Sequence, residues 1–135
     1  MDLKMMNAAE LAFVGDAVFE LLVRSRIARA TNTSPNTLHR MSVECVCAAA
    51  QSGALEAITP LLDEQELSIV RRGKNCTKTT VPKHSSPQLY RNATALEALF
   101  GYLYLSEQNS RITELFSAVC DYFDGRAQTD DCIAQ

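Results

Sequence analysis

The sequence lacks the features that mark several common classes of protein. No apolar stretch reaches the roughly 18 uninterrupted residues of a membrane-spanning helix, and the N-terminus has no charged-then-apolar signal pattern. The chain also shows no alternating strand pattern, no internal repeat and no glycine-rich phosphate-binding loop. We therefore expect a cytoplasmic protein with no membrane partner, built from helices rather than strands.

Ligands for a structural zinc ion are also poorly represented. The five cysteines are irregularly spaced and include no C-x-x-C pair, and the two histidines are far apart. Two of the cysteines are only two residues apart, so on a helix their side chains would point in widely different directions. We expect reduced thiols at the five positions, which are Cys45, Cys47, Cys76, Cys120 and Cys132.

What the sequence does contain is typical of one globular domain with an all-α fold. Its 135 residues, 47% of them hydrophobic, are enough for a core. Ser34-Pro35 and Thr59-Pro60 are signals for helix starts, whereas Gly73 and Gly125 are expected to end helices in the left-handed conformation. The predicted helices span residues 7–30, 34–53, 61–72, 89 or 92–106, and 110–123.

The charges are distributed unevenly along the chain. No acidic residue lies between Glu66 and Glu97, and the loop predicted over residues 74–88 is rich in lysine, serine and threonine. Such a loop is suited to phosphate groups of a nucleic acid, although a solvated charge run is the plain alternative. The candidate RNA-binding residues are Arg71, Arg72, Lys74, Asn75, Lys78, Thr79, Lys83, Tyr90 and Arg91.

Two carboxylates stand out because they lie in otherwise apolar helical runs. Asp16 has mainly apolar neighbours on its own helix face, and Glu97 carries the only formal charge between residues 93 and 105. Gly101 lies one turn after Glu97, and a glycine inside a helix commonly allows another backbone to approach. We therefore expect the two helices to cross near Glu97, with Asp16 opposite.

Two carboxylates that meet in a protein core repel each other unless a cation or a proton lies between them. A hard divalent cation with oxygen ligands, above all Mg²⁺, would remove the repulsion. The alternative is that Asp16 and Glu97 each pair with a nearby arginine or cap a helix end. From the pattern alone both interpretations stay open.

Three segments of the chain resemble a known family. Residues 11–18, Leu-Ala-Phe-Val-Gly-Asp-Ala-Val, resemble the signature helix of ribonuclease III catalytic domains. Residues 72–83, with Arg-Gly-Lys-Asn-Cys-Thr-Lys followed by Val-Pro-Lys, and residues 90–105, from Tyr-Arg-Asn-Ala-Thr to Tyr-Leu-Tyr-Leu, resemble the bacterial Mini-ribonuclease III subgroup. The resemblance covers roughly residues 11–105, and the three segments in order are far more specific than the Gly-Asp pair alone.

The resemblance implies a two-fold homodimer of helical subunits that hydrolyses double-stranded RNA with Mg²⁺. Asp16 and Glu97 match the catalytic, metal-binding acidic positions, and residues 1–125 would form the catalytic domain, followed by a frayed tail over 126–135. Positions that are acidic in larger relatives read Ala9, Ala12 and Thr94 here. The resemblance to the subgroup further implies a role in maturing large-subunit (23S) ribosomal RNA precursors.

The position of Glu20 has two interpretations. Glu20, one turn after Asp16, lies either near the metal or in an ion pair with Arg24, and the ion pair is the favoured interpretation.

The class of function also has alternatives. A non-catalytic helical module that binds RNA or protein would keep the same scaffold without the chemistry. A helical nucleotide pyrophosphatase is a third class, but the dense E-x-x-E carboxylate pairs of such enzymes are not found here.

Overall fold

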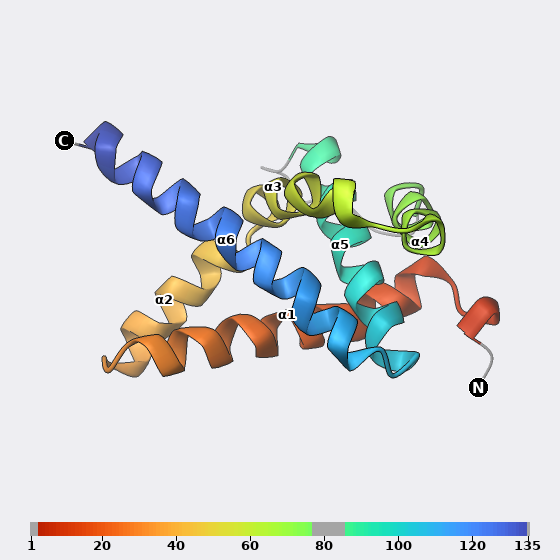
Figure 1. Cartoon of the computed structure of the whole chain (residues 1–135), viewed down its shortest axis with the longest axis horizontal. Coiled ribbons are helices and arrows are strands. Elements are labelled where there is room, and N and C mark those ends of the chain that lie inside the picture. Colours follow the sequence, from red (N-terminus) through yellow and green to blue (C-terminus); the bar gives the residue numbers. More distant parts are fainter. Residues whose placement is uncertain (1–2, 77–85, 135) are drawn as a thin grey trace.

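The computed structural model describes residues 3–76 and 86–134, without the side chains of Lys4 and residues 127–134. The described residues form six α-helices and contain no strand, which confirms the all-α prediction (Figure 1). The α-helices are α1 (Ala8–Ala30), α2 (Pro35–Val46), α3 (Ala48–Ile58), α4 (Glu64–Lys74), α5 (Pro87–Leu105) and α6 (Asn109–Ala134). Two short 3₁₀ turns, η1 (Leu3–Met5) and η2 (Thr59–Leu61), precede α1 and α4.

The starts of three helices are fixed by local side-chain hydrogen bonds. Asn7 caps α1 and forms a reciprocal capping box with Glu10. Ser34 caps α2, where Pro35 occupies the first helical position, as predicted. Asp63 caps α4 through a second capping box. Each cap satisfies backbone N–H groups that have no partner within their own helix.

Several predicted helix boundaries are wrong. The helix predicted over 34–53 is two helices, because Cys47 has an extended backbone between α2 and α3. Thr59-Pro60 begins η2 rather than a long helix, and α4 starts five residues after Thr59 at Glu64. α6 continues through Gly125 to Ala134, so the predicted end at Phe123 is wrong, while the assignment of residues 126–135 to a separate tail stays a prediction.

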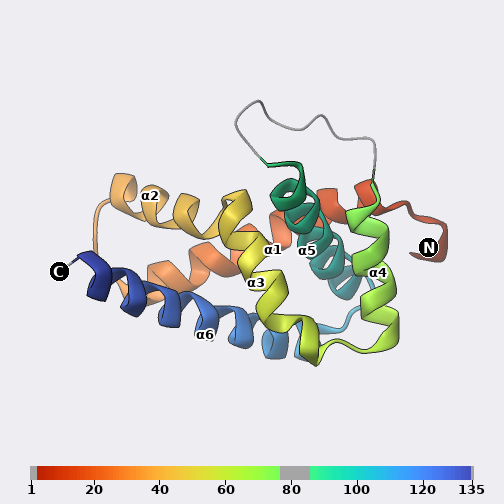
Figure 2. The same cartoon turned by 90° about the horizontal axis from the view of Figure 1, so that it is seen from above.

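Helix α5 lies at the centre of the molecule. It packs against α1, α3, α4 and α6, and its most extensive contact is with α1 (Figure 2). Its buried side chains include Leu96, Leu99, Phe100 and Leu103. The ring of Phe19 from α1 meets those of Phe100 and Phe116 edge-on, at centroid distances of 5.5 and 6.0 Å. The expectation that 93–105 is a core helix is confirmed. Within residues 3–76 and 86–134, no helix combines the length and the apolar character that a bilayer crossing requires.

The prediction that Gly73 ends a helix in a left-handed conformation is wrong. The φ of Gly73 is not positive, and the residue lies inside α4. A Cβ atom added at Gly73 would lie 2.6 Å from Cα of Ala95, so the missing side chain lets α4 approach the backbone of α5. This close contact brings the last turn of α4 beside the part of α5 that carries Glu97.

Candidate active site

The candidate active site is built on a close crossing of α1 and α5. A Cβ atom at Gly15 would lie 1.5 Å from the backbone oxygen of Glu97, and one at Gly101 would lie 1.9 Å from that of Leu11. Only residues without a Cβ atom allow such contact between two helix backbones. The predicted role of Gly101 is therefore confirmed. Gly15 was missed, although a second glycine in the other helix was a readable signal for the same crossing.

Asp16 and Glu97 are brought together by this crossing, as the sequence predicted. Asp16 follows Gly15 directly, and Glu97 is the residue whose backbone Gly15 touches. The expectation that the two carboxylates meet in the core is wrong for Asp16, which is exposed, while Glu97 is half-buried. Asp16 emerges beside Gly15, at the rim of the contact and not within it. The pair therefore lies at a surface that a polymer can reach.

The electrostatics of the pair identify Glu97 as an unusual carboxyl group. Desolvation by burial, then repulsion by Asp16, a hydrogen bond with Asp16 and repulsion by Glu20 raise the pKa of Glu97 to about 8. Without a cation, the Glu97 carboxyl therefore keeps its proton at neutral pH and donates a hydrogen bond to Asp16. A divalent cation offers a second way to relieve the same repulsion. Among the described residues no third acidic, histidine or cysteine side chain completes a metal-binding cluster.

Two neighbours of the pair have side-chain partners of their own. The Nε and Nη2 groups of Arg24 donate to Oε1 of Glu20 at 3.0 and 2.7 Å, which confirms the favoured ion pair. The hydroxyl of Thr94, one turn before Glu97, donates to the backbone oxygen of Tyr90 at 3.0 Å. The Thr94 oxygen keeps its acceptor lone pairs, since a hydroxyl both donates and accepts.

The candidate RNA-binding residues that the structure describes lie at the end of α4 and the start of α5. Arg71, Asn75 and Arg91 are exposed, and Lys74 and Tyr90 are half-buried. Arg72 is engaged within the protein, because its Nη2 group donates to the backbone oxygen of Met6. The remaining predicted RNA-binding residues, Lys78, Thr79 and Lys83, lie outside the described residues.

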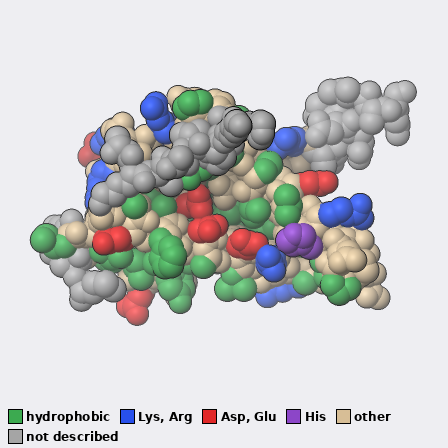
Figure 3. All heavy atoms as spheres, turned by 180° about the vertical axis from the view of Figure 1, so that it is seen from behind, with side chains coloured by type: hydrophobic (Ala, Val, Ile, Leu, Met, Phe, Trp, Pro, Cys, Tyr) green, Lys and Arg blue, Asp and Glu red, His purple; other side chains and the backbone are tan. Residues whose placement is uncertain are grey.

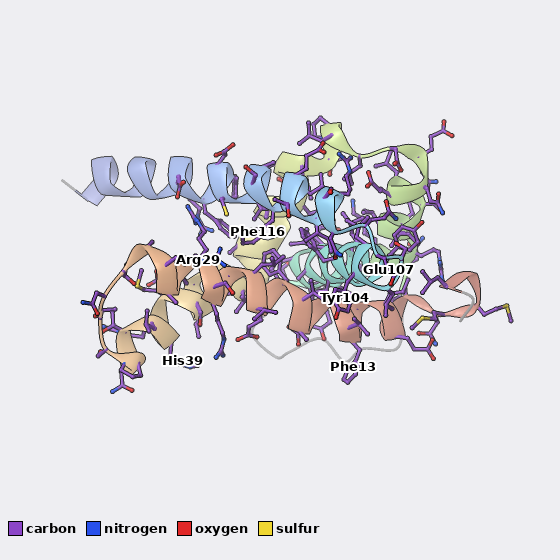
Figure 4. The ribbon with its side chains drawn as sticks, turned by 60° about the horizontal axis from the view of Figure 1, so that its bottom comes forward. Phe13, Arg29, His39, Tyr104, Glu107 and Phe116 are labelled. Carbon is purple, nitrogen blue, oxygen red and sulfur yellow. The ribbon has the colours of Figure 1, made fainter. Side chains whose placement is uncertain are left out.

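An apolar groove lies next to the acidic pair, between α1 and α6. Its volume is about 830 Å³, and Asp16 and Glu20 are among its lining residues. Phe13, Leu21 and Tyr104, which also line it, have exposed fractions of 82%, 66% and 53%. Figure 4 shows Phe13 pointing away from α1. Three large apolar side chains exposed in one groove indicate a protein contact surface.

One face of the molecule combines these features. Figure 3 shows acidic side chains in a row across the middle of this face, an apolar patch beside them, and basic side chains with a histidine further along. Of this arrangement, the sequence pattern predicted the acidic pair. It missed the prominence of Phe13 and Tyr104, because a helical apolar stripe normally indicates the core.

Comparison with known proteins gives consistent results. Residues 9–108 match the model of the family described as "Ribonuclease III domain". Curated relatives named Mini-ribonuclease 3 include those of Clostridium tetani, 37% identical over 96% of this chain and 86% of the relative, and Symbiobacterium thermophilum, 40% identical over 84% and 88%. The relative from a Thermoanaerobacter species is 45% identical, over 78% of this chain and 74% of its own length.

A solved structure has the same architecture. A crystal structure of a protein from Fusobacterium nucleatum superposes with a TM-score of 0.81 at 33% sequence identity, covering 88% of this chain and 97% of the other. The matched family region contains both Asp16 and Glu97, together with the whole of α4 and α5.

Proposed function

The chain belongs to the ribonuclease III family and is an endoribonuclease, and we propose that it hydrolyses phosphodiester bonds of double-stranded RNA with the help of Mg²⁺. The observation that carries the proposal is the juxtaposition of Asp16 and Glu97 at the crossing of α1 and α5. One carboxylate is exposed and the other half-buried, so the pair is accessible from solvent but held in a fixed place.

The two carboxylates fit a hard divalent cation. Their oxygens are the ligands that Mg²⁺ prefers, and burial together with repulsion by Asp16 raises the pKa of Glu97, so a cation that removed the repulsion would be favoured. Asp16 and Glu97 are the residues that would hold it. Because no third side chain of the described residues joins the cluster, water and RNA phosphate would supply further ligands. Affinity for Mg²⁺ in the absence of RNA is expected to be weak.

A Mg²⁺ ion held by Asp16 and Glu97 would supply activation of water and stabilisation of negative charge on the phosphate. The protein's own contribution is to position the two carboxylates and to neutralise charge on the RNA backbone. The contact of Gly15 with the Glu97 backbone fixes the separation of the two carboxylates. The hydroxyl of Thr94 is held one turn from Glu97 by its bond to Tyr90. Basic residues at the end of α4 and the start of α5 would contact the RNA backbone on either side of the cleaved bond.

The proposed reaction is tested by removing one charge at a time. Asp16→Asn and Glu97→Gln should each reduce Mg²⁺-dependent cleavage of long duplex RNA by roughly 10³-fold, because several kcal/mol of charge stabilisation would be lost. Cleavage is followed on denaturing gels, and thermal unfolding checks that the variants fold. Glu56→Gln, which removes an exposed charge on α3, is the matched control and should retain full activity. Full activity in Asp16→Asn would refute the assignment.

The proposed RNA surface includes the basic residues around α4 and α5. Lys74→Gln and Arg91→Gln should each reduce the salt dependence of RNA binding by about one unit of slope if each residue contacts one phosphate. Binding is measured with Asp16→Asn protein over a range of salt concentrations. Arg29→Gln, which removes an exposed charge near the end of α1, serves as a control. An unchanged slope in both test variants would place the RNA elsewhere.

The proposed assembly is a two-fold homodimer. One chain carries one acidic pair, whereas cleavage of both strands of a duplex requires two. The groove between α1 and α6, with Phe13, Leu21 and Tyr104 exposed beside Asp16, is the proposed interface. Light scattering on Phe13→Asp, compared with the unaltered protein, should show a shift from dimer to monomer.

The proposal also includes a physiological substrate and a cellular location. Precursors of large-subunit (23S) ribosomal RNA, processed in the cytoplasm, are the proposed physiological substrate. This part of the proposal rests on the similarity to proteins named Mini-ribonuclease 3. Deletion of the gene should lead to accumulation of incompletely processed large-subunit precursor, which RNA blotting would detect.

A further inference from the structure

A second hollow on the molecule lies between α1 and α2. Its volume is about 280 Å³, just below the usual range for ligand pockets of about 300–1,000 Å³. Ile27, Ala28, Pro35 and Leu38 form an apolar lining, and Arg24 and His39 provide the polar side chains. Ser42 also contributes, although its hydroxyl is buried and donates to the backbone oxygen of His39. The hollow therefore combines an apolar lining with a guanidinium and an imidazole.

Arg24 is positioned by a residue next to the candidate active site. Both Nε and Nη2 bind Oε1 of Glu20, and Glu20 in turn acts electrostatically on Glu97. The Nη1 group of Arg24 forms no bond with the part of the chain that the structure describes, and 57% of the side chain is exposed. An exposed ion pair of this kind is weak in water, so the guanidinium can contact a phosphate without a large loss.

The hollow and Asp16 of the acidic pair lie at different positions along the same helix, α1. Asp16, Glu20 and Arg24 follow one another at four-residue spacing on α1, so Arg24 lies about 12 Å along the helix axis from Asp16. The face in Figure 3 shows basic side chains and a histidine continuing beyond the acidic row. A nucleic acid strand that reaches the acidic pair and extends along α1 would therefore pass the hollow.

The chemistry of the lining favours a single unpaired nucleotide. A base in a duplex is stacked on both faces and paired at its edge, so it cannot enter a hollow of this size. A base that is turned out of the helix offers a flat apolar ring, which stacks on histidine or on an arginine plane. Its phosphate is anionic and suits Arg24. We propose that the hollow between α1 and α2 binds one unpaired nucleotide of the RNA substrate, with the base against His39 and the phosphate on Arg24.

This proposal rests on the proposed function and adds a specificity element to it. The proposed duplex cleavage uses the acidic pairs of two subunits and the basic residues of α4 and α5, and it does not involve the hollow. The hollow would select RNA in which a bulged or terminal unpaired nucleotide lies at a fixed distance from the cleaved bond. Specificity for irregular helices would then come from shape and stacking, and not from reading paired bases.

The experiment compares one perfect duplex with duplexes that carry a single-nucleotide bulge at one to six positions from the cleaved bond. The unaltered protein should show a maximum of cleavage efficiency at one bulge position. His39→Ala and Arg24→Gln should remove that maximum, by roughly tenfold in kcat/KM, because a stacking or phosphate contact is lost. His39→Ala should cleave the perfect duplex at an unchanged rate, because His39 has no contact with the acidic pair or with its neighbour Glu20. His39→Phe, which keeps the stacking ring, should retain the maximum.

A binding measurement tests the same contact without cleavage. With 2-aminopurine as the bulged base and Asp16→Asn protein, stacking in the hollow should quench fluorescence, and the added His39→Ala change should restore it. Arg40→Gln, which removes an exposed charge next to His39 that does not line the hollow, is the matched control and should behave as the unaltered protein. Equal cleavage of bulged and perfect duplexes by the unaltered protein would overturn the inference.

Two further outcomes would also overturn it. A maximum that survives in His39→Ala would show that the bulge is recognised elsewhere. A change in oligomeric state of His39→Ala, seen by light scattering, would show that a second copy of the chain occupies the hollow. Failure of the unaltered protein to cleave any duplex would be a different result, since it would contradict the proposed function itself.

Discussion

Two carboxylates, Glu66 and Glu97, respond to burial in opposite ways. Glu66 is almost completely buried at the start of α4, and bonds from Arg111 at 2.8 Å to both of its oxygens, with the backbone N–H of Asp63, lower its pKa. Glu97 is only half-buried, yet its pKa rises to about 8, because burial is accompanied by a second carboxylate instead of a cation. Burial by itself therefore does not reveal what a carboxylate does.

The two surroundings indicate two different roles. Arg111 also donates to the backbone oxygen of Leu61 and to Glu114, so Glu66 belongs to a fully bonded corner that joins α4 to α6. The pair at the α1 and α5 crossing forms no ion pair with a lysine or arginine of the described residues. A structural site satisfies its own charge, whereas a site that binds a cation or substrate leaves the charge for the ligand to satisfy.

The contrast between the two carboxylates is tested most strongly by removing the cation beside Glu66. Arg111→Met should reduce the free energy of unfolding by about 3 kcal/mol, because Glu66 would be left buried without a partner. Chemical denaturation measures this loss. Arg24→Met, which removes the cation from an exposed pair, is the control and should change stability by less than about 0.5 kcal/mol. Equal losses in the two variants would show that burial of Glu66 is not the cause.

The acidic pair can be disturbed separately through its backbone contact. Gly15→Ala places a Cβ atom 1.5 Å from the backbone oxygen of Glu97, so α1 and α5 must separate, at a cost of about 2–3 kcal/mol. Chemical denaturation measures this cost, and RNA cleavage should fall with it. Gly125→Ala is the matched control, because a Cβ atom there meets nothing within 4 Å and should stabilise α6 by about 0.5–1 kcal/mol. A Gly15→Ala variant as stable as the unaltered protein would contradict the close crossing.

The smallest predicted effect concerns pH and distinguishes the two carboxylates by sign. The folded protein holds the Glu97 proton up to about pH 8, whereas the unfolded chain loses it near the ordinary value of 4.5, so this group makes stability fall as pH rises through that window. Glu97→Gln should remove this slope and stabilise the metal-free protein by about 1–2 kcal/mol at pH 8.

Glu66 provides the opposite slope in the same measurement. Its lowered pKa makes stability fall as pH decreases below the ordinary value, when the carboxylate that binds Arg111 becomes protonated. Thermal unfolding in the presence of a chelator between pH 3 and 8 would show both slopes. A Glu97→Gln variant that is less stable than the unaltered protein at pH 8 would contradict the repulsion assigned to the acidic pair.

Parts of the fold were predictable because their causes are local. The α1 prediction of residues 7–30 is close to the observed Ala8–Ala30, since Asn7 and Glu10 supply the capping box within four residues of chain. Ser34-Pro35 fixed the start of α2 for the same reason. Gly101 predicted the helix crossing, because a glycine within an apolar helix commonly marks the close approach of another backbone.

Other parts depended on residues that are distant in sequence. Gly73 and Gly125 were both predicted to end helices, but Gly73 accommodates the backbone of Ala95, and α6 continues past Gly125. The break at Cys47 separates two helices that pack differently, and nothing in the local sequence required it. Arg72, a candidate RNA-binding residue, donates to the backbone oxygen of Met6, 66 positions away, and no local pattern predicts this contact.

The helical class, the cap of α2 and the two carboxylates in apolar surroundings could all be read from the amino-acid sequence, because they follow from spacing and from bonds over a few residues. Packing between distant helices was needed to bring Asp16 and Glu97 together at Gly15, to satisfy Glu66 with Arg111, and to leave Phe13 facing outward. The charge state and the exposure of a side chain are set by the elements packed against it, and those elements come from far along the chain.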